Sequence, residues 1–159
     1  MLKFYNYDIV FQEIPDEVTL AVNITGCPFR CSGCHSPHLR EDIGTPLTGQ
    51  TLDSLVQLYG TGITCVCFMG GDSNPEEVDR LASYVKTHYS LLTGWYSGRE
   101  HIPKEICTAN FDYIKLGPYM AQFGGLKHPN SNQHLYMVEK NGVLTDITTK
   151  FAAKSVGTR

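Results

Sequence analysis

The sequence predicts an α/β domain whose sheet is mainly parallel and ends in an antiparallel hairpin. Segments rich in β-branched residues alternate with segments whose apolar residues recur at helical spacing. Residues 63–69 are almost continuously apolar, as expected for a strand of a parallel sheet that is covered on both faces. Near the end of the chain, Asn141-Gly142 separates two strand-like runs and is typical of a two-residue hairpin turn. Together, these three observations define the fold class.

The individual elements follow from local patterns along the chain. A helix is expected over residues 51–59, where apolar side chains recur at offsets 0, 3, 4 and 7. A second helix begins at Pro75 with Asn74 as its N-cap. The other expected elements are strands over 18–24, 63–69, 90–96, 113–116, 134–139 and 143–147, and a short helix over 103–108. We expect one domain over residues 1–151 and a flexible tail over 152–159.

Composition narrows the functional classes. The chain has 159 residues, of which 42% are hydrophobic and 18% charged, as in a soluble globular domain. A formal net charge of -3 provides no basic surface for nucleic acid. The longest apolar run is too short to cross a bilayer, and the first residues lack the apolar core of a signal peptide. We therefore expect a cytoplasmic protein, in which six cysteines favour metal or redox chemistry over disulfides.

The most informative motif is the C-x3-C-x2-C spacing of Cys27, Cys31 and Cys34. Three thiolates on one loop suit a soft metal centre, and a centre with three protein ligands keeps one position for a substrate. We interpret the motif as an iron–sulfur site that follows the first predicted strand. The alternative is zinc with His35 or His38 as fourth ligand, although zinc motifs more often come as two paired clusters.

The other three cysteines fit no metal motif. Cys65 and Cys67 alternate along the apolar run and share one face of that strand, but their one-residue gap suits zinc poorly. We expect them and Cys107 to be small buried apolar residues.

A second motif, Gly70-Gly71-Asp72, ends the apolar strand. Two glycines let a ligand approach the backbone, and a carboxylate can bind an ammonium group. Parallel α/β folds also bind ligands at the carboxyl ends of their strands. With the cysteine motif, this segment resembles the radical S-adenosylmethionine (radical SAM) enzymes, which carry Gly-Gly-Glu here. The resemblance implies a partial, open (βα)-type radical SAM barrel, a 4Fe-4S cluster on the three cysteines and S-adenosyl-L-methionine as cofactor.

The chain is also similar in length and order to the activating proteins of anaerobic (class III) ribonucleoside-triphosphate reductases. The similarity lies in residues 23–28, 33–35, 94–98, 113–119, 124–126 and 130–133. It implies an oxidoreductase that cleaves S-adenosylmethionine reductively and generates a glycyl radical on the reductase. The implied partners are the glycyl-radical subunit and a low-potential electron donor such as flavodoxin or ferredoxin, with no nucleic acid or membrane.

The resemblance also implies a set of cofactor-binding residues, and no catalytic residue beyond cluster and cofactor. Gly70, Gly71 and Asp72 would bind the amino-acid part, although Asp72 is one methylene shorter than the usual glutamate.

Many members carry an aromatic residue just before the third cysteine, where this chain has Gly33, so Phe29 and His35 are candidates for the adenine contact. Ser97 and Arg99, which come after the strand predicted over 90–96, and Lys115 are the remaining candidates for cofactor contact. Lys115 stands out because a lysine inside an apolar strand is unusual.

Three other functions stay open from the sequence. The chain could activate a different glycyl-radical enzyme, such as one of the formate-lyase type, although these activases are usually longer. It could instead be a radical enzyme that acts on a small molecule. The third alternative is a zinc-binding module without catalysis.

Overall fold

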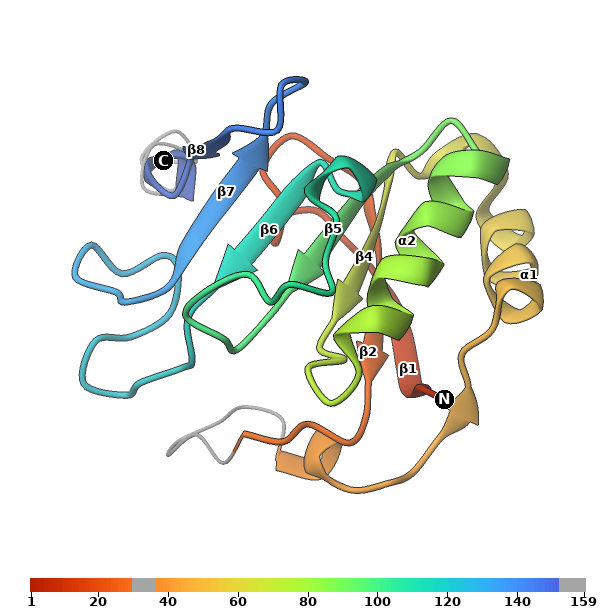
Figure 1. Ribbon diagram of the computed structural model, residues 1–159, viewed down its shortest axis with the longest axis horizontal. Helices are drawn as coiled ribbons and strands as arrows, with labels where there is room; N and C mark the ends of the chain where they lie inside the picture. The colour runs from red at the N-terminus through yellow and green to blue at the C-terminus, as the bar shows by residue number, and fades with distance from the viewer. Residues whose placement is uncertain (30–36, 152–159) are drawn as a thin grey trace.

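The computed structural model describes residues 1–29 and 37–151, which form one eight-stranded sheet with two α-helices (Figure 1). The strands are β1 (Lys3–Val10), β2 (Thr19–Ile24), β3 (Thr45–Pro46), β4 (Cys65–Met69), β5 (Leu92–Tyr96), β6 (Tyr113–Leu116), β7 (His134–Val138) and β8 (Leu144–Asp146). The helices are α1 (Gly49–Tyr59) and α2 (Pro75–His88), with short 3-10 turns at Pro37–Arg40, Gly60–Gly62 and Thr108–Asn110. The predicted tail over 152–159 lies outside the described residues.

The sheet is mixed, in the order β3-β1-β2-β4-β5-β6-β7-β8. Its four central strands, β2, β4, β5 and β6, are parallel, whereas both edges pair antiparallel. The predicted parallel arrangement thus describes the centre, and β7 and β8 form the expected hairpin at Asn141-Gly142. Its connection has three residues, 140–142, instead of two: the Glu139 N–H donates to the Val143 carbonyl at 2.8 Å. The strands β1 and β3 were not predicted from the sequence. The register aligns Asn23, Met69, Tyr96 and Lys115 across the central strands, so their carboxyl ends lie in one row.

Both α-helices pack on one face of the sheet (Figure 1). The face of α2 that packs on the sheet is fully buried and consists of Val78, Leu81, Ala82 and Val85. Asn74 is confirmed as the N-cap, because its side chain accepts a hydrogen bond from the Glu77 N–H at 3.3 Å. None of the helices in the described part of the chain combines the length and apolar character needed to cross a bilayer.

The opposite face of the central strands is covered by the segment between β1 and β2. Cys65 and Cys67 point to this face and are completely buried against Ile14, which confirms their predicted role. The Tyr96 hydroxyl donates a hydrogen bond to the Glu13 carbonyl and so ties the covering segment to β5.

Two expectations for residues 103–108 are wrong. The segment forms turns instead of a helix, because its backbone is attached to α2: the Cys107 N–H donates to the Asp79 carboxylate at 2.7 Å. This attachment leaves the Cys107 side chain exposed, although we expected it to be buried. Ile106 provides the apolar contact of this segment with the core instead.

Candidate functional site

The segments that follow β2, β4 and β5 meet at the carboxyl end of the parallel strands, at the lower edge of the view in Figure 1. A methyl group placed on Gly98, after β5, would come within 2.7 Å of the Phe29 ring, after β2. A methyl group on Gly26 would lie 3.9 Å from the Ser73 hydroxyl, after β4. The start of the cysteine segment therefore packs on the segment after β5 and lies near the segment after β4.

Cys27 is half-buried at the start of the cysteine segment. The Gly26 N–H donates to the Glu41 carbonyl at 3.1 Å, and the Cys27 N–H donates to the Leu39 carbonyl at 2.9 Å. These two hydrogen bonds join the residues before the cysteine segment to those after it. The other predicted ligands, Cys31 and Cys34, and the adenine candidate His35 lie outside the described residues. Within the described ranges, no three or more His, Cys, Asp or Glu side chains are grouped to hold a metal ion.

Gly70 and Gly71 make the sharp turn from β4 into α2. Their φ angles are +109° and +90°, a region that residues with a side chain rarely adopt. A methyl group on Gly71 would also come within 2.5 Å of Val78 Cγ2 in α2. The Gly70 carbonyl accepts a hydrogen bond from the Trp95 indole N–H at 2.7 Å. Both glycines are therefore required by the turn itself, and the turn places Asp72 beside the end of β5.

Asp72 is buried, with 3% of its surface exposed, and its carboxylate accepts hydrogen bonds from the segment after β5. The Ser97 hydroxyl donates to Oδ1 at 2.5 Å, and the Gly98 N–H donates to Oδ2 at 3.0 Å. The Arg99 guanidinium donates from Nη2 to the Asp72 carbonyl at 2.8 Å, and its Nε lies 3.6 Å from Oδ1. The structure thus brings together Asp72 and Ser97, which the sequence analysis singled out separately.

Lys115 lies next to this group of residues, on β6. Its ammonium donates to the Ser97 carbonyl at 2.9 Å and to the Gly117 carbonyl at 3.0 Å. It also lies 5.6 Å from the centre of the Tyr96 ring. With only 8% of its surface exposed, Lys115 anchors the ends of β5 and β6 to each other.

A groove of about 540 Å³ opens beside these residues. Its lining includes Phe29, a candidate for the adenine contact, together with Gly98 and Arg99. Glu100 to Pro103 and Pro118 complete it. From the sequence, Gly98 stood out only as part of residues 94–98, one of the runs similar to the reductase-activating proteins. A single glycine in a loop has no local pattern that marks a binding surface.

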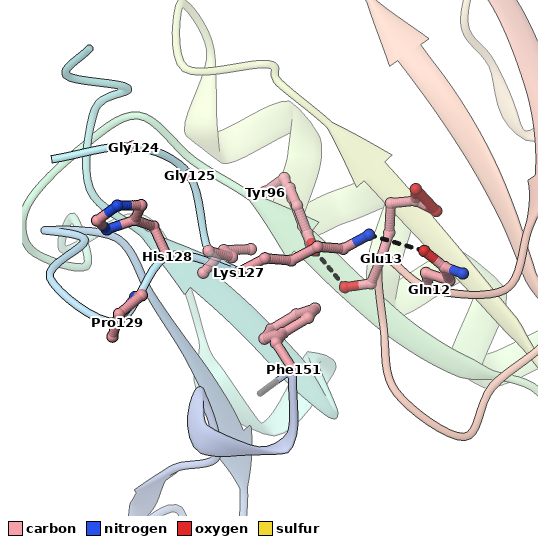
Figure 2. Close-up of a pocket in the computed structure, with 10 residues that line it drawn as sticks. Gln12, Glu13, Tyr96, Gly124, Gly125, Lys127, His128, Pro129 and Phe151 are labelled. Atoms are coloured by element: carbon pink, nitrogen blue, oxygen red, sulfur yellow. Dashed lines mark hydrogen bonds between the residues drawn. The ribbon is translucent and has the colours of Figure 1, made fainter. Parts of the chain in front are cut away.

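A second groove, of about 610 Å³, lies beside Tyr96 on the face opposite the helices (Figure 2). Figure 2 shows the Tyr96 hydroxyl directed at the main chain of Glu13, and Lys127 directed at Gln12. The Lys127–Gln12 hydrogen bond measures 2.7 Å and links the segment between β6 and β7 to the segment between β1 and β2. Among the described residues, none of the predicted site residues lines this groove.

Comparison with known families identifies the class of protein. Residues 17–105, more than half of the chain, match the family described as the 4Fe-4S single cluster domain. The chain therefore belongs to this family of iron–sulfur proteins. The matched range contains the cysteine motif, Gly70-Gly71-Asp72 and Ser97, and it confirms the predicted 4Fe-4S cluster. Neither the curated proteins nor the solved structures provide a match.

Proposed function

We propose that this 4Fe-4S protein is a radical SAM activase that generates a glycyl radical on an anaerobic ribonucleoside-triphosphate reductase. One observation carries the proposal: beside the cysteine motif of a 4Fe-4S family, the Phe29 ring packs on Gly98, which follows β5, and Gly26 lies near Ser73, which follows β4. The motif resemblance described above supplies the choice of cofactor and of partner. The open barrel that the resemblance implies is part of the proposal.

The chain offers residues that fit both cofactors. Cys27 is half-buried, and with Cys31 and Cys34 it would hold the cluster. The groove beside Phe29 lies within the range of about 300–1,000 Å³ typical of small-molecule sites. Phe29 provides an aromatic ring, and Gly98, which has no side chain, lets this ring pack closely on its backbone at the groove. When bound, the reduced cluster would supply one electron to S-adenosylmethionine, whose cleavage would give methionine and a 5′-deoxyadenosyl radical able to take a hydrogen atom from the partner's glycine.

The protein residues then have three tasks in this function. The cysteines would hold the cluster, with its electron coming from a low-potential donor such as flavodoxin or ferredoxin. Phe29 and the residues after β5 would orient the adenosine group. The 97–99 turn (Ser97, Gly98 and Arg99), held by Asp72 and Lys115, would keep this surface in place before the cofactor arrives.

The first test is cofactor cleavage. Anaerobically reconstituted protein is expected to bind about four iron and four sulfide per chain. With dithionite and S-adenosylmethionine, it should release 5′-deoxyadenosine and methionine. Cys27→Ala should lose both cluster and cleavage, whereas Cys107→Ala should keep them, because Cys107 is exposed and lies outside the matched range. A wild-type protein that carries the cluster but cleaves no cofactor would refute the proposal.

The second test concerns the partner. Incubation with an anaerobic reductase, cofactor and reductant should produce the doublet of a glycyl radical in electron paramagnetic resonance. Cleavage without this doublet on any class III reductase would refute the activase and favour a radical enzyme that acts on a small molecule.

A further inference from the structure

We propose that Asp72 is a positioning residue, which shapes the adenosine side of the groove by holding the 97–99 turn instead of contacting the amino group of the cofactor. This inference rests on the proposed function for the identity of the ligand. It assigns Asp72 a role different from that implied by the Gly-Gly-Asp motif.

The contacts of Asp72 point away from direct ligand binding. Each carboxylate oxygen already accepts a hydrogen bond from the 97–99 turn, at 2.5 Å from Ser97 and 3.0 Å from Gly98. The main-chain carbonyl of Asp72 accepts a third hydrogen bond, from Arg99. With 3% exposure, the residue presents almost no surface to a molecule in the groove. The carboxylate therefore accepts hydrogen bonds from the protein's own 97–99 turn.

The effect of Asp72 reaches the groove through Gly98. The Gly98 N–H is held by Asp72, and its Cα packs so closely on Phe29 that an added methyl group would lie 2.7 Å from the ring. Both Gly98 and Phe29 line the groove. If the hydrogen bond to Asp72 is lost, the backbone at Gly98 can move relative to the ring, and the surface for a flat base changes.

Ser97 also links Asp72 to the 97–99 turn, through its side-chain hydroxyl. Its hydroxyl donates to Asp72 and accepts from the Arg99 N–H at 3.0 Å, so a single hydroxyl closes the turn. Its carbonyl is held by the Lys115 ammonium. Because Asp72 and Ser97 hold one turn and share a hydrogen bond, the effects of removing them should not add.

Two nucleosides distinguish positioning from direct contact. S-adenosylhomocysteine carries the amino-acid group, whereas 5′-methylthioadenosine lacks it but keeps the adenosine. We would measure equilibrium binding of each to cluster-loaded wild type, Asp72→Asn, Ser97→Ala and the double variant. If Asp72 is a positioning residue, Asp72→Asn should lower the affinity for both nucleosides by the same factor, about tenfold for the loss of a hydrogen bond to a charged group. The double variant should bind the nucleosides no more weakly than the weaker of the two single variants.

A matched control is Asp79→Asn. Asp79 also accepts a backbone hydrogen bond, from Cys107, and does not line the groove, so nucleoside affinity should stay at the wild-type value. A second readout needs no cofactor: the Gly98 amide should exchange its hydrogen faster in Asp72→Asn than in wild type. Unchanged exchange would overturn the inference.

The binding outcomes separate this inference from the proposed function. If Asp72→Asn weakens only S-adenosylhomocysteine, Asp72 contacts the amino-acid group and the inference is wrong, while the proposed function stands. If wild-type protein binds neither nucleoside, the proposed function is refuted and the inference falls with it.

Discussion

Gly71→Ala should be strongly destabilising, because two independent physical effects meet at this position. The φ angle of Gly71 is +90°, and the added methyl group would come within 2.5 Å of Val78 Cγ2. Val78 is completely buried in α2, so it cannot move away without disturbing the core. The substitution thus tests whether the Gly-Gly-Asp turn is a requirement of the fold as well as of the site.

The expected magnitude is the sum of the two effects. A residue with a side chain at positive φ costs about 1–2 kcal/mol, and overpacking in a core costs about 1–3 kcal/mol. Gly71→Ala should therefore lower the free energy of unfolding by about 2–5 kcal/mol. With a urea m-value of about 2 kcal/mol/M, the midpoint should fall by roughly 1–2.5 M.

Two other glycines of the chain separate the effects. Gly60 has a φ of +56° with no atom within 4 Å of an added methyl group, so Gly60→Ala should show backbone strain alone, about 1–2 kcal/mol. Gly62 has neither strain nor a close neighbour, so Gly62→Ala should be neutral or slightly stabilising.

The assay is urea unfolding followed by the fluorescence of Trp95, the only tryptophan, whose indole N–H binds the carbonyl of the same turn. The reasoning is refuted if Gly71→Ala costs no more than Gly60→Ala.

Three further predictions concern other parts of the structure. Burial raises the pKa of the Cys65 thiol to about 12, so iodoacetamide should modify the exposed Cys107 in native protein and Cys65 only after unfolding, as mass spectrometry would show. Equal labelling rates would contradict the burial. Tyr96→Phe removes the hydrogen bond to the Glu13 carbonyl, so it should cost about 1 kcal/mol in urea unfolding and expose the segment between β1 and β2 to proteolysis. Unchanged proteolysis would show that this bond does not hold the segment. Hydrogen bonds from two tyrosine hydroxyls lower the pKa of Asp53, so its stabilisation is complete above about pH 4 and is lost as the pH falls through the lowered value. Asp53→Asn should therefore lower the midpoint of urea unfolding more at pH 6 than at pH 3. An equal difference from wild type at both pH values would contradict this prediction.

Local patterns predicted most of the central elements. The helix that begins at Pro75, the strand over 113–116 and the hairpin at Asn141-Gly142 all depend on neighbours within a few residues, so the sequence shows them directly. In contrast, the polar residues Asn6 and Asp8 weaken the strand pattern in the sequence of β1. This strand is held by its pairing with β2, which the sequence of β1 alone does not show. The expected helix over 103–108 failed because Asp79, more than twenty residues away, binds the backbone of this segment. Such a contact has no local signal.

The sequence by itself indicated the chemistry of this protein, because the spacing of Cys27, Cys31 and Cys34 predicts an iron–sulfur site wherever the loop lies, and the family match supports the cluster. It also indicated Gly70-Gly71-Asp72 as a site at the end of a strand. Only the tertiary structure shows which groups Asp72 contacts there. Its partner Ser97 is 25 residues away, and the two meet because parallel register places the ends of β4 and β5 side by side. Strand register is a property of the whole sheet, so the role of a carboxylate at its edge emerges only when the chain has folded.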